Sequence, residues 1–92
     1  MTLFAVIYEY GATDDELATR RPEHRDYLDR LDELVLSGPW DGGRGALIVL
    51  DTASAERAEA VVAGDPFVEA GFVARHEVHA WEPVLGRLLD QV

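Results

Sequence analysis

The segment from Leu3 to Tyr10, LFAVIYEY, is apolar on both of its faces if it forms a β-strand. Because strand side chains alternate between faces, the two faces carry Leu3, Ala5, Ile7 and Phe4, Val6, Tyr8. Residues 46–50, ALIVL, repeat this pattern. A strand that is apolar on both sides needs cover on both sides. Any fold of this chain must therefore enclose these two segments between two layers.

Four segments rich in branched and aromatic residues predict strands, and they span residues 3–10, 34–40, 46–50 and 72–81. One helix is predicted from about Pro22 to Leu34, with Pro22 at its first position, so that residues 11–19 form a polar loop. A second helix is predicted over residues 55–63, capped by Ser54 and ended by Gly64. Asp65-Pro66 predicts the cap and first residue of a short helical turn through about residue 70.

The predicted order is β-α-β-β-α-β, which is the order of ferredoxin-like α+β folds. The glycine-rich stretch 42–45 predicts a hairpin turn between the second and third strands, because it lacks the Gly-Lys-Ser/Thr ending of a phosphate loop. We expect one domain over residues 1–82. An amphipathic tail follows over residues 83–92, with an apolar side made by Val84, Leu85, Leu88 and Leu89.

Two helices can cover only one face of such a sheet, so the cover for the other face must come from outside the chain. We therefore predict a homodimer in which two sheets pack face to face. The small size of the chain favours the same outcome, because a domain of this length buries only about 60–65% of its unfolded surface.

Composition excludes several kinds of chemistry. The 92 residues include no cysteine, and all eight basic residues are arginine. Thiolate nucleophiles, disulfides and cysteine metal sites are excluded, as is Schiff-base chemistry through lysine. The formal net charge of −10 argues against nucleic acid and anionic membranes as partners. Met1-Thr2-Leu3 leads into the first strand without a secretory signal pattern, so we expect a cytoplasmic protein.

His24 is the main candidate for catalysis. It lies in the run Arg21-Pro22-Glu23-His24, at the first turn of the predicted helix. The apolar stripe of that helix continues through Tyr27, Leu28, Leu31, Leu34 and Val35. An imidazole kept neutral by the positive end of a helix could take a proton from a substrate. The alternative is a histidine at the edge of the core, hydrogen-bonded to a backbone carbonyl.

Asp65 is the candidate partner of His24. An aspartate directly before proline at a helical turn is commonly an N-cap. A carboxylate has about four acceptor sites, so Asp65 could also bind the second nitrogen of His24 and orient the ring. In a ferredoxin-like fold the two helices lie side by side and antiparallel, which would bring the two residues together.

Three further residues are candidates for substrate binding: Arg21, Ser37 and Gly38. Arg21 could hold an anionic group at the mouth of the site, or it could be an exposed arginine that balances an acidic surface. Ser37-Gly38-Pro39 could offer a hydroxyl and a close backbone, or form a bulge in a short strand. Tyr8 and Tyr10 share a strand face and could line a small cleft or pack in the core.

His76 and His79 lie on the fourth predicted strand, on opposite faces, because their spacing is three. Both rings cannot reach one metal ion from there, so we expect no metal site. We expect one ring to be partly buried at an interface and the other to pair with nearby charges.

Several of these segments together resemble the YCII-related (YciI-like) family. They are Arg21-Pro22-Glu23-His24 with Tyr27-Leu28, Ser37-Gly38-Pro39, Ala46-Leu47-Ile48-Val49, Gly64-Asp65-Pro66-Phe67 and Val78-His79-Ala80-Trp81. The resemblance covers about Leu3 to Trp81. It implies a dimeric α+β barrel similar to muconolactone isomerase, with a His–Asp site at His24 and Asp65 and with Ser37–Pro39 close to that site.

Residues and resemblance together predict a cofactor-independent enzyme in which His24 and Asp65 transfer a proton. The expected reaction is isomerisation or elimination on a small cyclic or quinone-like compound, anionic if Arg21 binds it. No cofactor is expected. The alternatives are a non-catalytic dimeric module that binds a small ligand or assists a partner enzyme, and a purely structural dimer. An open cleft at His24 would favour the enzyme, and a closed, packed His24 would favour the module.

Overall fold

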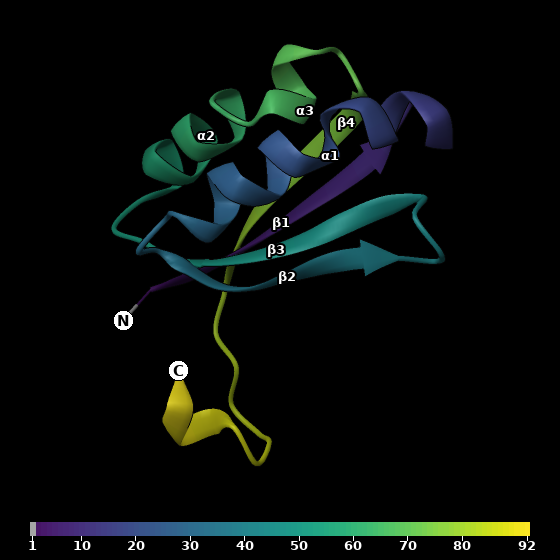
Figure 1. Cartoon of the computed structure of the whole chain (residues 1–92). Helices are drawn as coiled ribbons and strands as arrows, with labels where there is room; N and C mark the ends of the chain where they lie inside the picture. The colour runs from purple at the N-terminus through teal and green to yellow at the C-terminus, as the bar shows by residue number, and fades with distance from the viewer. Residues whose placement is uncertain (1) are drawn as a thin grey trace.

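The computed structural model describes residues 2–92, and its four strands form one antiparallel sheet in the order β2-β3-β1-β4. The elements are β1 (Leu3–Tyr10), α1 (Asp14–Asp29), β2 (Leu34–Trp40), β3 (Gly45–Asp51), α2 (Ala55–Ala63), α3 (Pro66–Glu69) and β4 (Val73–Trp81). The three helices lie over one face of the sheet (Figure 1). The predicted α+β ferredoxin-like arrangement, with its hairpin between β2 and β3, is confirmed.

The core lies between the helices and the helix-facing side of β1 and β3. Val6 is opposite Ile48 on β3 and Val78 on β4, and Val6 and Ile48 are at most 1% exposed. The helices complete this layer through buried residues on α1 and α2, namely Leu28, Ala58, Val61 and Val62. Burying a leucine or valine side chain contributes roughly 1.5–3 kcal/mol, so this layer fixes where the helices lie on the sheet.

The opposite face of the sheet carries exposed apolar side chains. Leu36 on β2 is 66% exposed, Leu47 on β3 is 43% exposed and Trp81 on β4 is 48% exposed. The two-sided apolar pattern of the strands is therefore real, and its second side is only partly covered within residues 2–92. Leu3 and Val49 are buried on that side, at 4% and 7% exposure, and the C-terminal tail lines a pocket together with them. A homodimer through this face remains our prediction for the rest of the cover.

Helix α1 begins eight residues before the predicted position. The Thr13 hydroxyl accepts a hydrogen bond from the Glu16 backbone N–H at 3.2 Å, and the Glu16 carboxylate accepts one from the Thr13 backbone N–H at 2.9 Å. This reciprocal capping box starts the helix at Asp14. The predicted loop over residues 11–19 is therefore wrong, and Pro22 lies inside the helix with an exposed ring.

The C-terminal end of α1 also differs from the prediction. The helix ends at Asp29, and the Leu31 N–H bonds the Leu28 carbonyl in a tighter final turn. Leu34 and Val35 therefore belong to β2 and not to the apolar stripe of the helix. The predicted ends of the other helices are confirmed: Ser54 caps α2, Gly64 follows it, and Asp65 caps α3 with Pro66 first.

The last ten residues leave the domain on the side of the sheet opposite the helices (Figure 1). They end in one 3-10 turn over Leu89–Gln91. Four apolar side chains of this tail are exposed by 40–90%: Val84, Leu85, Leu88 and Leu89. Among residues 2–92, no helix has both the length and the apolar character that crossing a membrane requires.

Candidate active site

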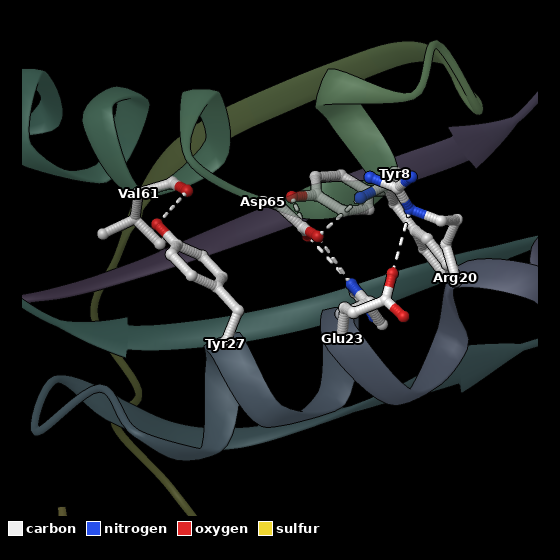
Figure 2. Close-up of polar contacts among 8 residues, drawn as sticks. Tyr8, Arg20, Glu23, Tyr27, Val61 and Asp65 are labelled. Atoms are coloured by element: carbon white, nitrogen blue, oxygen red, sulfur yellow. Dashed lines mark hydrogen bonds and ion pairs between the residues drawn. The ribbon is translucent and has the colours of Figure 1, made fainter.

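Asp65 is a fully buried carboxylate, 0% exposed, at the junction of α2 and α3. It accepts hydrogen bonds from the Tyr8 hydroxyl at 2.8 Å and from the Phe67 backbone N–H at 3.0 Å. The third donor is the His24 ring, whose Nδ1 lies 2.8 and 3.0 Å from the two carboxylate oxygens. Figure 2 shows Asp65 with the Tyr8 hydroxyl pointing at it. Each donor comes from a different element, so the carboxylate joins β1, α1 and α3.

Tyr27 supports this junction from α1. Its hydroxyl donates a hydrogen bond to the Val61 carbonyl at 2.7 Å (Figure 2). A methyl group at Gly64 would come within 2.6 Å of the same hydroxyl oxygen. Residue 64 must therefore be small for α1 to approach the end of α2, and this close approach places Asp65 beside His24.

His24 is on α1, is 7% exposed, and stacks on the Phe67 ring with centroids 3.9 Å apart and planes 6° from parallel. It lies well beyond the first turn of the helix. The predicted effect of the helix N-terminus on this ring is therefore wrong, because that effect falls off within one turn. Asp65 and Phe67 determine the orientation of the imidazole instead.

The hydrogen bonds assign the two ring nitrogens of His24 to different roles. An ionised carboxylate only accepts hydrogen bonds, so Nδ1 carries the hydrogen that points to Asp65. In the neutral ring, Nε2 then has a free lone pair. No protein group in residues 2–92 makes a hydrogen bond to Nε2. The expected contact between the His24 ring and the Asp65 carboxylate is thus present.

His24 lines a cavity of about 810 Å³ between α1 and the β2–β3 hairpin. The cavity wall also includes Arg21, Ser37 and Gly38. The structure thus brings all the sequence-predicted site residues to one place, with Asp65 behind the His24 ring. Arg21 lies within α1 and not before it, and it is only partly exposed. Its neighbour Arg20 instead pairs with Glu23 at 3.0 Å (Figure 2).

Sequence reasoning missed the role of Tyr8. The strand pattern placed its ring on the same face as Phe4 and Val6, and it is 1% exposed. A buried tyrosine hydroxyl usually finds a partner, which was the available signal, but the pattern could not name Asp65. Burial, and then the charge of Asp65, raise the pKa of Tyr8 far above its usual range. The hydroxyl is therefore a permanent donor to the carboxylate.

His76 and His79 each pair with a glutamate. His76 Nε2 lies 2.8 Å from Glu59 on α2, and His79 Nε2 lies 3.0 Å from Glu77. His76 is opposite Tyr8 and His79 is opposite Ala5 in the sheet, so the prediction of opposite faces is confirmed. Nowhere in the described part of the chain do three His, Asp or Glu side chains gather closely enough to hold a metal ion.

This geometry defines a class of protein. Its members are ferredoxin-like α+β domains with a buried carboxylate next to a histidine that lines a cavity. The family model of the YCII-related domain matches residues 1–82. The chain belongs to this family, as the sequence resemblance indicated. A search of the curated proteins finds no significant match.

Solved structures share the fold. 5-Chloro-2-hydroxyhydroquinone dehydrochlorinase (TftG) from Burkholderia phenoliruptrix, in complex with 2,5-dihydroxybenzoquinone, is 22% identical with a TM-score of 0.78 over 87% of this chain and 93% of its own. Protein Atu4242 from Agrobacterium tumefaciens is 18% identical with a TM-score of 0.58, and the match covers 91% of this chain and 94% of that protein. The N63A mutant of SnoaB, a cofactor-independent oxygenase from Streptomyces nogalater, is 12% identical with a TM-score of 0.53. The match covers 91% of this chain and 95% of that protein. At these identities the likeness shows the fold alone.

Proposed function

We propose that this protein is a small, cofactor-independent enzyme in which His24, oriented by Asp65, removes a proton from a cyclic or quinone-like compound. One observation carries the proposal. Nδ1 of His24 is held by a buried carboxylate, and His24 also lines a cavity of about 810 Å³. That volume is ample for a single substituted ring.

The proposed step begins when Nε2 of His24 takes a proton from a carbon or hydroxyl of the bound ring. The N–H bond forms as the C–H or O–H bond breaks, and Asp65 stabilises the resulting imidazolium. In an elimination, the electron pair left on the substrate expels a leaving group such as chloride. In an isomerisation, the same proton returns at a different carbon. Neither route consumes an oxidant or a reductant.

The remaining cavity residues suit the charge that develops on the substrate. Arg21 can balance an oxyanion on the ring, and Ser37 and Gly38 can offer a hydroxyl and a backbone N–H to it. These groups come from α1 and β2, which face each other across the cavity.

The similar structures support a quinone-like ring as the class of substrate. The dehydrochlorinase TftG was solved with 2,5-dihydroxybenzoquinone bound, and SnoaB is described as a cofactor-independent oxygenase. We therefore favour a hydroxylated or chlorinated quinone-like ring as the substrate of this chain.

The His24→Asn variant tests the proposal directly. The asparagine amide can keep a donor where Nδ1 lies, so Asp65 stays hydrogen-bonded while the base at Nε2 is lost. We expect turnover to fall about 10²–10⁴-fold with ligand binding retained. Equal turnover in the variant and the wild type would refute the proposed base.

A non-catalytic dimeric module that binds a small ligand or assists a partner enzyme is the second candidate. The observation that favours it is the small exposure of His24, 7%, together with its stacking on Phe67. This candidate predicts that small quinone-like rings bind in the cavity and leave chemically unchanged, with identical binding by wild type and His24→Asn.

A further inference from the structure

Three side chains that could bind an anion lie beside His24 in the same cavity. They are Tyr10 at the end of β1 and the two arginines Arg21 and Arg25, which are one turn apart on α1. Residues at this spacing share one face of a helix. The cavity therefore has two guanidinium groups and one phenol on the walls next to the proposed base.

The Tyr10 ring contacts Phe67, whose ring in turn stacks on His24. The Tyr10 ring meets the Phe67 ring edge-on with centroids 5.6 Å apart, and Phe67 stacks on His24 at 3.9 Å. Tyr10 is partly exposed, and its hydroxyl makes no hydrogen bond to any described residue, unlike the hydroxyls of Tyr8 and Tyr27. Its hydroxyl is thus free to donate to a ligand.

The two arginines of the cavity differ from the other arginines of α1. Arg20 pairs with Glu23 at 3.0 Å and Arg30 pairs with Asp26 at 3.2 Å. Neither Arg21 nor Arg25 has a carboxylate within ion-pair distance in residues 2–92. The chain has a formal net charge of −10, and yet these two guanidinium groups on one cavity wall have no carboxylate partner. They are therefore available to an anionic ligand.

Carboxylates also line this cavity, at Asp14, Asp26 and Asp29. The Arg30 ion pair compensates Asp26, and Asp14 lies in the first turn of α1, where the helix N-terminus favours negative charge. Asp29 has no ion-pair partner among residues 2–92, so the attraction for an anion in this cavity comes from Arg21 and Arg25.

Tyr10 keeps its proton at neutral pH. Burial, and then the charge of Asp65, raise the pKa of Tyr10 to about 12, although Arg21 and Arg25 act in the opposite direction. The phenol is therefore a hydrogen-bond donor, and the two guanidinium groups are close enough to affect its ionisation.

We propose that Tyr10, Arg21 and Arg25 form an oxyanion subsite, which selects substrates with an ionised hydroxyl or an enolate oxygen next to the carbon attacked by His24. This inference rests on the proposed function and names the substrate class of the same site. When His24 takes the proton, negative charge moves to that oxygen. The Tyr10 hydroxyl donates a hydrogen bond to it, and Arg21 and Arg25 balance its charge.

The test is a binding measurement without turnover. The probe is 2,5-dihydroxybenzoquinone, which is ionised at neutral pH, and its neutral counterpart is 2,5-dimethoxybenzoquinone. Titration calorimetry on the wild-type protein should show binding of the ionised ring at least about tenfold tighter than of the neutral one. Tyr10→Phe and Arg25→Gln should each weaken binding of the ionised ring about tenfold and leave the neutral ring unaffected.

A matched control completes the design. Arg20→Gln removes a charge from the same helix, from a side chain that pairs with Glu23. This variant should bind the ionised ring as tightly as the wild type. The subsite is overturned if the wild type fails to bind the ionised ring or binds both rings equally. It is also overturned if Tyr10→Phe and Arg25→Gln bind the ionised ring as tightly as the wild type does.

The same measurement separates this inference from the proposed base. His24→Asn should still prefer the ionised ring, because the subsite does not include Nε2. Loss of turnover with retained preference supports both ideas, whereas retained turnover with retained preference refutes only the role of His24.

Discussion

Asp65 carries a structural role and a candidate chemical role at once. A buried carboxylate without partners costs several kcal/mol, and here Tyr8, His24 and Phe67 supply the donors. The same bonds that make burial of this charge tolerable also fix the tautomer of His24. Stability and the orientation of the ring should therefore respond together when one donor is removed.

Replacing His24 separates these two roles. His24→Ala removes a donor to Asp65 and the stacking on Phe67, so the free energy of unfolding should fall by about 2–4 kcal/mol. His24→Asn keeps a donor and should cost about half of that or less. Urea unfolding monitored by circular dichroism measures both. Equal losses for the two variants would show that the hydrogen bond to Asp65 contributes little.

The sequence predicts the His24–Asp65 contact from antiparallel helices with His24 at a helix start, and that premise is wrong because His24 lies ten residues after the first residue of α1. The contact forms instead because α1 packs against α3, which Asp65 caps. The hydroxyl of Tyr8 could not be assigned in this way. Strand alternation tells which face a side chain lies on, and not which buried group it reaches.

At the scale of elements, the error at α1 has a physical cause. Pro22 suits the first position of a helix, and that preference led to a start eight residues too late. The signature Thr13-x-x-Glu16 is a capping box, and it determines the observed start. Two local signals competed, and the structure follows the cap, with Pro22 inside the helix and its ring exposed to solvent.

The start of β3 requires glycine. A methyl group at Gly45 would collide with the Tyr8 carbonyl oxygen and with the Trp40 ring. Gly45→Ala should therefore push β3 away from β1 beside Tyr8 and lower the free energy of unfolding by about 1–3 kcal/mol. Gly38→Ala is the control, because a methyl group at Gly38 meets nothing within 4 Å. Urea unfolding should leave the control near wild type, and equal midpoints for all three proteins would contradict the expected clash.

Glu33 connects the start of β2 to the end of β3 and to α2. It accepts hydrogen bonds from Arg57 at 2.7 and 2.8 Å and from the Thr52 hydroxyl at 2.8 Å. The Arg57 bonds, and then the Thr52 bond, lower the pKa of Glu33 to about 2. In an unfolded chain the pKa of this group is about 4.3. The stabilisation is therefore complete above that pH and is lost as the pH falls toward about 2.

This titration predicts how stability depends on acid. Between about pH 4.5 and pH 2.5, the free energy of unfolding of the wild type should fall more steeply than that of Glu33→Gln. The difference should be modest, because the Arg57 side chain is 47% exposed and solvent screens the pair. Asp26→Asn, which removes a more exposed carboxylate, should follow the wild-type slope. Parallel curves for wild type and Glu33→Gln would contradict the assignment.

At the scale of the whole molecule, the sheet face opposite the helices, which the tail covers only in part, is the main unexplained surface. Contiguous apolar patches are uncommon on monomeric proteins. Here Leu36, Leu47 and Trp81 lie on one face, and the apolar tail leaves the domain on that same side (Figure 1). The two-sided pattern was predictable from the alternation along the two central strands.

We expect a homodimer formed through this face. Light scattering after size-exclusion chromatography should give twice the mass of one chain at micromolar concentration. Leu47→Asp places a charge in the centre of the face and should shift the mass toward that of one chain. Ala60→Asp, on the exposed side of α2, should remain a dimer. A wild-type protein that elutes as a stable monomer would rule out this assembly.

Proton transfer by His24 is tested most directly by turnover in D₂O. The substrates are a panel of chlorinated hydroxyquinols and small lactones, with chloride release and deuterium uptake as the two readouts. The proposed mechanism predicts that the wild type processes at least one compound, and that His24→Asn binds this compound but turns it over at least about 10²-fold more slowly. Undiminished turnover in His24→Asn, or no turnover of any compound by the wild type, would contradict it.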